Sequence, residues 1–203
     1  SYLLAYLLPE IHQQYHHLKF IVREDAPNIL VEGLTEGRHD LLLIPLPLNN
    51  DSFHIETLIR EELFIVMAND HPLATKSSIT TDDLVGEKVV NMEDNHLYSK
   101  QIDELCNRFG LAPLKDYQGT SLDALRAMVS TGVGIAFFPS LYVHSEIRAE
   151  SNLHVMKIKG ESIYRMHAIA WRHSSPARIF FREFSVVFKE LIKEKLGDVV
   201  EVM

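Results

Sequence analysis

The sequence predicts an α/β fold of two subdomains, with the chain crossing from one to the other twice. Segments of helical periodicity alternate with short apolar runs, which is typical of α/β architecture. The run 40–44 is apolar from Leu41 onward, as expected for a strand of a parallel sheet that is buried on both faces. Turn-forming clusters near residues 69 and 172 then divide the chain. We therefore expect an inner subdomain of residues 70–172, inserted into an outer subdomain of residues 1–69 and 173–203.

The outer subdomain is predicted to begin and end with a helix. Leu3, Leu7 and Ile11 recur at helical spacing, and Pro176 suits the start of a long final helix. Asn28 is the expected cap of a second helix, which Gly37 ends. The elements expected here are helices 2–15, 28–36 and 176–195, and strands 19–24, 40–44, 55–59 and 63–68.

The inner subdomain is predicted to alternate strands and capped helices. Thr80 or Thr81 is expected to cap a short helix that ends at Gly86, and Ser121 to cap a longer helix. The other elements expected here are strands 88–92, 115–118, 134–138, 153–158 and 163–171, and helices 98–109 and 122–131.

Charge and cysteine content exclude several function classes. The chain has 20 basic and 28 acidic side chains, a formal charge of −8, which does not suit binding to nucleic-acid phosphates. The single cysteine, Cys106, excludes a disulfide framework and a cysteine-rich zinc site. No apolar run approaches the roughly 20 residues of a membrane span. The expected compartment is the cytoplasm.

Three stretches occur in an order that resembles the effector-binding region of LysR-type transcriptional regulators. They are residues 34–45, 62–74 and 120–139, and the resemblance covers essentially the whole chain. It implies two Rossmann-like subdomains of the periplasmic-binding-protein type, joined by two crossover hinges. It also implies a small-molecule effector between the subdomains, a homodimer, and a DNA-binding helix-turn-helix outside this chain. The family usually has one more strand before the position of Ser1, so we expect a fragment of a longer protein.

Residues 93–106 resemble the redox loop of the peroxide-sensing, OxyR-type branch of that family. Cys106 matches the second redox cysteine, but Leu97 stands at the position of the first. Pro27 and Lys100 replace a peroxide-binding threonine and an aspartate. An intramolecular disulfide switch is therefore not expected. Two interpretations of Cys106 stay open: an inert buried thiol, and a redox group that acts by a non-disulfide or intermolecular route.

The predicted effector site lies where two strands end. Asn95, His96 and Leu97 follow strand 88–92, while Thr120 and Ser121 follow strand 115–118. Ligands of doubly wound domains bind beyond the carboxyl ends of strands, and a helix start at Ser121 offers N–H groups to a carboxylate. The alternative is that Thr120 and Ser121 only cap their helix. Gly134 is expected to add a backbone donor, and the resemblance adds Pro45 and Pro27.

Association as a homodimer or higher homo-oligomer is the expected state. The residues assigned to the interface are Leu8, Val22, Leu125, Met128 and Thr131. The alternative is that these faces pack only within their own subdomain.

Catalysis, cofactors and metals receive little support from motifs. His12 and His16 are spaced for a helix-face metal site, but a solvated face is the preferred interpretation, and no metal site is predicted. The acidic pairs Glu61-Glu62 and Asp82-Asp83 are expected on the solvated surface. We expect no cofactor and no enzyme activity. Two alternatives stay open: a stand-alone solute-binding protein with an export signal, and an enzyme on the same fold using His96 and Asp94.

Overall fold

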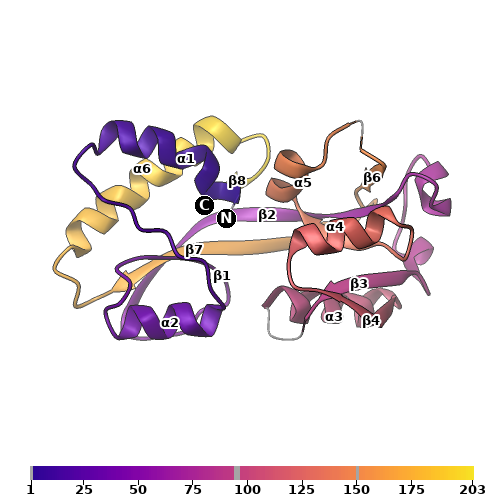
Figure 1. Cartoon of the computed structure of the whole chain (residues 1–203), viewed down its shortest axis with the longest axis horizontal. Coiled ribbons are helices and arrows are strands. Elements are labelled where there is room, and N and C mark those ends of the chain that lie inside the picture. Colours follow the sequence, from indigo (N-terminus) through magenta and orange to yellow (C-terminus); the bar gives the residue numbers. More distant parts are fainter. Residues whose placement is uncertain (1, 94–96, 150) are drawn as a thin grey trace. The chain divides into compact units, whose positions relative to one another are not determined.

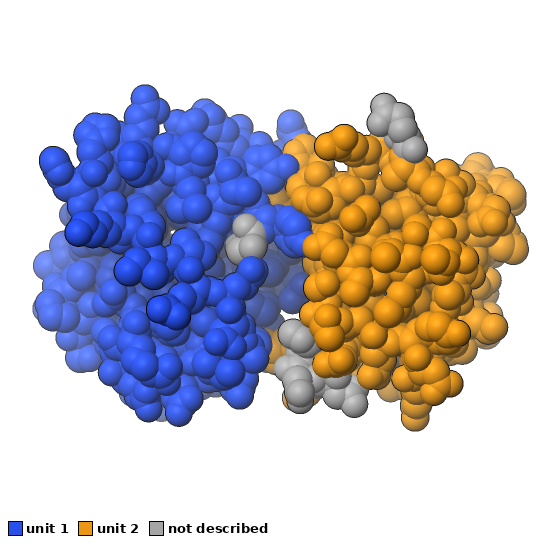
Figure 2. All heavy atoms as spheres, viewed as in Figure 1, with its two compact units in different colours: residues 1–61, 165–203 blue, residues 62–164 orange. Residues whose placement is uncertain are grey.

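The computed structural model describes residues 2–93, 97–149 and 151–203, and the chain divides into two compact units. Unit 1 comprises Ser1–Glu61 and Arg165–Met203, and unit 2 comprises Glu62–Tyr164 (Figure 2). The chain passes between the units inside two long strands, β2 (Phe53–Ala68) and β7 (Tyr164–Arg172). The turn clusters that we expected as boundaries instead mark the far ends of these strands. The crossings therefore lie several residues earlier than predicted.

Unit 1 is an antiparallel sheet with helices (Figure 1). β1 (Leu42–Pro45) pairs with β7, with Leu42 opposite Ala170, and β8 (Glu201–Val202) pairs with the first part of β2. The helices are α1 (Tyr2–Gln14), α2 (Pro27–Thr35) and α6 (Arg178–Leu196). A buried cluster joins α2 to the sheet through Leu34, Leu42, Ile44, Phe53 and Ala170.

The first and last helices of unit 1 each bury one apolar face. Leu3, Leu7 and Ile11 of α1 are buried, as are four aromatic or leucine side chains of α6: Phe181, Phe184, Phe188 and Leu191. A salt bridge of 2.8 Å joins Lys195 Nζ of α6 to Glu10 Oε1 of α1. Helical spacing was sufficient here because one stripe of each helix packs on the unit's core.

Two predictions in unit 1 are wrong. Residues 19–24 form no strand: Ile21 is 83% exposed, and this segment pairs with no strand in the part of the chain that the structure describes. An alternating pattern forms a strand only where a neighbouring strand accepts its backbone hydrogen bonds. The expected parallel sheet is also absent from the described part of unit 1, because β1 runs antiparallel to β7.

The start of α2 also differs from the prediction. Pro27 is its first residue and Ala26 precedes it, so Asn28 lies inside the helix and does not cap it. Proline suits this position because the first N–H of a helix has no partner in the helix. Asp25 Oδ1 instead accepts the N–H of Ala26 at 2.9 Å.

Unit 2 contains the parallel strands β3 (Lys88–Met92) and β4 (Ala112–Gly119). The second part of β2 pairs antiparallel with both β5 (Ala136–Pro139) and β6 (Leu153–Met156). The helices are α3 (Leu97–Phe109), α4 (Leu122–Ser130) and α5 (Ser140–Glu146), together with short 3-10 helices at Pro72–Thr75 and Asp82–Leu84. α5 and β8 were not predicted from the sequence, and β2 is one continuous strand where two were predicted.

One acidic pair is not on the surface as expected. Glu61 is only 2% exposed, and its Oε2 lies 2.7 Å from Nε2 of His167 within unit 1. Strand alternation explains why Glu61 is buried although a surface position was expected for both glutamates. Neighbouring residues of a strand, such as Glu61 and Glu62, point to opposite faces of β2. Asp82 is exposed, as predicted. The Lys76 ammonium, together with the N–H and hydroxyl of Thr80, donates to the Asp83 carboxylate and lowers the pKa of that carboxyl to about 2.

Candidate functional site at one edge of unit 2

Two strands and two helices of unit 2 meet at one edge of its parallel pair. Met92, the last residue of β3, lies opposite Gly119, the last residue of β4. The Glu93 N–H donates to the Gly119 carbonyl at 3.1 Å. α3 begins at Leu97 and α4 at Leu122, so both helices start just beyond this edge. The structure thus brings Leu97 to the same edge as Thr120 and Ser121, while Asn95 and His96 lie outside the described residues.

The start of α4 is satisfied by its own side chains. Ser121 Oγ accepts the Ala124 N–H at 3.2 Å, so the predicted cap is confirmed. Asp123, in the first turn, accepts the Tyr142 hydroxyl at 2.8 Å, and Arg126 Nε donates to the same hydroxyl oxygen at 3.0 Å. Burial and the Asp123 carboxylate raise the pKa of Tyr142, so this hydroxyl stays a donor at neutral pH. Thr120 and Ser121 themselves are exposed.

The start of α3 has a different electrostatic character. No acidic residue stands in its first turn, and Lys100, its fourth residue, is exposed. Leu97 is half-buried. A helix start carries partial positive charge, and a nearby cation adds to it. Lys100 therefore adds to the positive end of α3, while the exposed acidic residue Glu93 lies between β3 and this helix.

A buried polar network, which was not predicted from the sequence, fixes α3 to β3. Asn91 is 5% exposed, and its Nδ2 donates to the Ser99 carbonyl, the Ser99 hydroxyl and Asp103 Oδ1 at 3.1, 3.2 and 3.1 Å. Its Oδ1 accepts the Met92 N–H at 2.7 Å, and Ser99 Oγ donates to the Met92 carbonyl at 2.9 Å. The available signal was one amide inside an otherwise apolar strand, because a buried polar group needs partners.

Gly134 lies at the other end of β3. The N–H of the next residue, Ile135, donates to the carbonyl of Lys88, the first residue of β3, at 2.8 Å. A Cβ at Gly134 would lie 2.6 Å from that carbonyl oxygen. The structure does not bring Gly134 together with Ser121. A glycine at position 134 lets its backbone pack closely against the backbone of Lys88, where a side chain would not fit.

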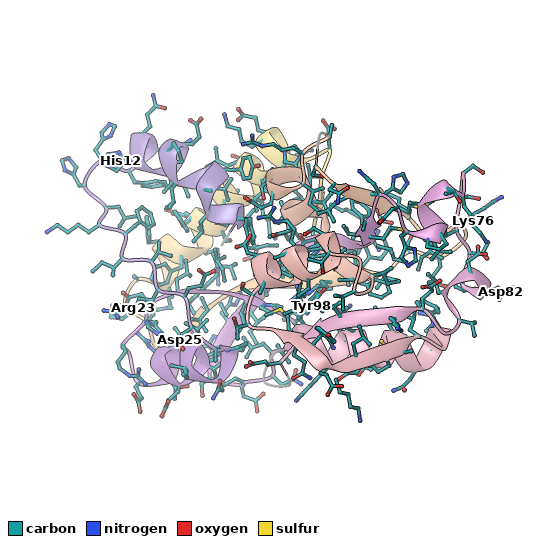
Figure 3. The ribbon with its side chains drawn as sticks, turned by 45° about the vertical axis from the view of Figure 1, so that its right-hand side comes forward. His12, Arg23, Asp25, Lys76, Asp82 and Tyr98 are labelled. Atoms are coloured by element: carbon teal, nitrogen blue, oxygen red, sulfur yellow. The ribbon has the colours of Figure 1, made fainter. Side chains whose placement is uncertain are left out.

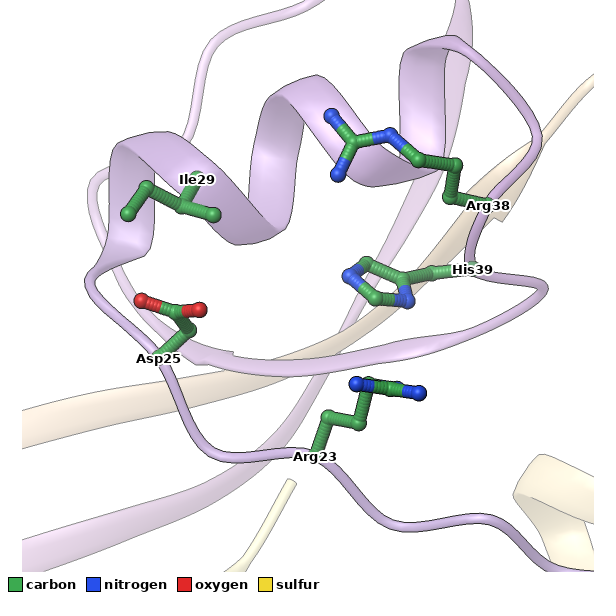
Figure 4. Close-up of a pocket in the computed structure, with 5 residues that line it drawn as sticks. All are labelled: Arg23, Asp25, Ile29, Arg38 and His39. Carbon is green, nitrogen blue, oxygen red and sulfur yellow. The ribbon is translucent and has the colours of Figure 1, made fainter.

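Pro27 and Pro45 belong to unit 1, at the start of α2 and the end of β1. Unit 1 also carries a hollow of roughly 400 Å³, lined by Arg23, Asp25, Ile29, Arg38 and His39 (Figure 4). Arg38 Nε already donates to Glu36 at 2.7 Å, and the Asp25 carboxylate also faces the hollow. The lining is mostly exposed, and none of the residues predicted for the effector site belongs to it.

The thiol of Cys106 lies on the buried face of α3. It is 3% exposed, and burial, together with the Asp103 charge, raises its pKa to about 11. A reactive cysteine needs a lowered pKa and access to solvent. The surroundings of Cys106 provide neither.

The residues assigned to a dimer interface differ in exposure. Val22 is 53% exposed, Thr131 is exposed, and Leu8 and Met128 are half-buried. Leu125 is fully buried within unit 2 and leaves no surface for a partner. The helical stripe was assigned correctly in spacing, but its centre faces the core.

The histidines of the first helix do not form a metal site. α1 ends at Gln14, so only His12 lies on it, and the exposed His12 side chain points away from the unit (Figure 3). Among the described residues no group of three or more histidine, cysteine or acidic side chains is arranged to hold a metal ion. No helix in those residues has the length and apolarity needed to cross a membrane.

The fold is that of a domain built from two α/β units. Residues 1–192 match the family model described as the LysR substrate binding domain, and the chain belongs to that family. The predicted fold class and family resemblance are confirmed.

Named relatives and solved structures agree with this assignment. The chain is 29% identical over 184 residues to the DNA-binding transcriptional dual regulator OxyR of Escherichia coli K12, covering 91% of this chain and 60% of that protein. It is 27% identical over 140 residues to the transcriptional dual regulator GltC of Bacillus subtilis, covering 68% of this chain and 47% of that protein. The reduced OxyR regulatory domain from Pseudomonas aeruginosa superposes with a TM-score of 0.82 at 25% identity, covering 94% and 90% of the two chains. The chain spans about 60% of the length of its first curated relatives.

Proposed function

We propose that this chain senses a small polar or anionic effector for a LysR-type transcriptional regulator, at the edge of unit 2 where α3 and α4 begin. The observation that carries the proposal is the pairing of Met92 with Gly119, since it places both helix starts at one edge. Leu97, Thr120 and Ser121 are the described residues assigned to the effector, and Asn95 and His96 are assigned with them from the sequence. DNA contact belongs to a domain outside this chain.

The donors at this edge favour an anion. Backbone N–H groups of a first helical turn and the hydroxyls of Thr120 and Ser121 suit carboxylate or sulfate oxygens. Lys100 adds a full positive charge at α3, and the one acidic side chain in the first turn of α4, Asp123, is bound to Tyr142. Leu97 gives the site an apolar wall, which suits an organic acid with an apolar portion.

A peroxide sensor based on Cys106 is less well supported. The relatives named hydrogen peroxide-inducible genes activators include proteins 26–29% identical to this chain. In this chain the thiol is buried and protonated at neutral pH, and Leu97 occupies the position of the other redox cysteine. Effector binding without thiol chemistry is therefore the function proposed.

The same proposal includes a cytoplasmic homodimer. The surfaces assigned to it are the exposed parts of α1 and its following segment, at Leu8 and Val22, and of α4, at Met128 and Thr131. Two-fold pairing is the commonest oligomer symmetry.

The experiment is a ligand panel measured by thermal shift and titration calorimetry. The panel contains sulfate, phosphate and small carboxylates, since one structural relative is described as the sulfate-bound OxyR2 E204G regulatory domain of Vibrio vulnificus. At least one anion should stabilise the protein. The Lys100→Glu variant should bind that anion with an affinity lower by about threefold to tenfold. Lys193→Glu makes the same charge change on α6 of unit 1 and should have little effect. Equal weakening by both variants, or no stabilisation by any anion, contradicts the proposal.

A further inference from the structure

Helix α3 reaches from the proposed effector edge to the place where the chain leaves unit 2. Its residues Leu97–Phe109 span about 20 Å at the usual rise per residue. Its first residue lies at the edge, its fifth residue, Gln101, contacts Tyr164, and its twelfth residue, Arg108, contacts Glu161. Tyr164 is the last residue of unit 2 before the second crossing.

The first turn of α3 is held firmly by its neighbours in unit 2. Asn91 and Ser99 bind it to the end of β3, and the Tyr98 hydroxyl donates to the Phe137 carbonyl of β5. Tyr98 is 5% exposed and lies at the start of the helix (Figure 3). A shift at the edge must therefore move the helix together with its anchors.

The body of the helix is packed along one face. Ile102, Leu105, Cys106 and Phe109 are all at most 6% exposed. Close-packed side chains have little free volume, so a displacement at one end is passed along the helix.

Two polar contacts tie α3 to the exit segment. Gln101 Nε2 donates to the Tyr164 carbonyl at 2.9 Å, and Arg108 Nη2 donates to Glu161 Oε1 at 2.9 Å. Between them, the Leu63 N–H donates to the Ile163 carbonyl at 2.8 Å. Leu63 is the second residue of unit 2 along β2, and Tyr164 is the first residue of β7. The exit segment is therefore hydrogen-bonded to one crossing strand and continues into the other.

We propose that α3 carries effector occupancy to residues 161–164, with Gln101 and Arg108 as the coupling residues. The proposal rests on the proposed effector edge and adds the route by which occupancy reaches the crossing strands. Coupling of this kind is a difference in ligand affinity between two arrangements, so it acts in both directions.

The first test is a sulfate titration followed by amide NMR of the whole 203-residue chain. In the parent protein we expect shifts at residues 97–99 and 120–122, and also at 161–164. The double variant Gln101→Ala/Arg108→Ala should keep the first two sets and its sulfate affinity within about twofold, while the set at 161–164 disappears. Asn107→Ala, an exposed position on the same helix, should keep all three sets. Shifts at 161–164 that persist in the double variant overturn the inference but leave the effector site intact.

A parent protein without shifts at residues 97–99 and 120–122 would contradict the effector edge itself, and the inference with it. The second test needs no ligand. Glu161→Gln weakens the Arg108 contact and should shift the amides of Leu97–Ser99 in the free protein, because coupling is reciprocal. Lys159→Gln, a nearby exposed change in charge, should not. Unshifted amides in the Glu161→Gln protein overturn the coupling route.

Discussion

The two helices that start at the edge of unit 2 are anchored in different ways. α4 begins with a serine cap, and its acidic first turn is bound to a tyrosine of α5. α3 has no acidic residue in its first turn, and the Asn91 amide of β3 holds it through hydrogen bonds. One helix start uses its own side chains, whereas the other depends on a buried neighbour.

This difference indicates at which helix start an anionic effector gains the larger favourable interaction with the helix dipole. At α4 the Asp123 carboxylate already offsets the helix dipole, so the dipole contributes less to the binding of an anion there. At α3 the first turn is fixed in place and contains no acidic side chain of its own. A helix start without an acidic side chain in its own first turn is suited to bind an anion.

The largest expected effect comes from removing the anchor of α3. Asn91→Ala should lower the free energy of unfolding by about 3 kcal/mol, because it leaves a cavity and buried groups without their partner. Urea denaturation measures this change. Asn107→Ala, an exposed asparagine of the same helix, should change stability by under about 0.5 kcal/mol. Similar losses in both variants would show that α3 does not depend on the Asn91 network.

The next largest effect is expected at the anchor of α4. Tyr142→Phe keeps the ring stacked on Phe138 but removes the hydroxyl that Asp123 and Arg126 share. The expected loss is about 1–2 kcal/mol, smaller than at Asn91 because Asp123 and Arg126 reach water. Chemical denaturation tests this, and a loss as large as that of Asn91→Ala would mean that the two starts are anchored equally strongly.

The sequence predicted the anchor of α4 but not that of α3. Ser121 stands directly before an apolar helical stripe, and a cap is a local feature that spans three residues. Asn91 finds its partners in Ser99 and Asp103 only after α3 has packed on β3, which depends on the tertiary fold. The same reason explains residues 19–24, where the pattern was right for a strand but no strand pairs with it. It also explains Glu61, whose burial depends on the face of β2 that it occupies.

A third prediction concerns the cap alone. Ser121→Ala should destabilise the protein by about 1 kcal/mol, and Ser121→Gly by only a few tenths, because glycine leaves the first N–H groups open to water. Thermal unfolding of both variants separates these outcomes. Equal losses would indicate that Ser121 stabilises the fold through contacts other than its hydrogen bond to Ala124.

The last prediction concerns the thiol on the buried face of α3, whose titration changes stability only at alkaline pH. Folding raises the pKa of Cys106 from 9.0 to about 11, because burial and Asp103 both disfavour the thiolate. The unfolded chain therefore loses its thiol proton first, and stability that is complete below pH 9 declines as the pH rises toward 11. Urea midpoints between pH 8 and 10.5 should fall more steeply for the parent than for Cys106→Ala, which has no thiol to titrate. The folded parent should also resist a maleimide at pH 8 and react once unfolded. Rapid labelling of the folded protein would mean that α3 opens readily, and it would restore the redox interpretation that its packing argues against.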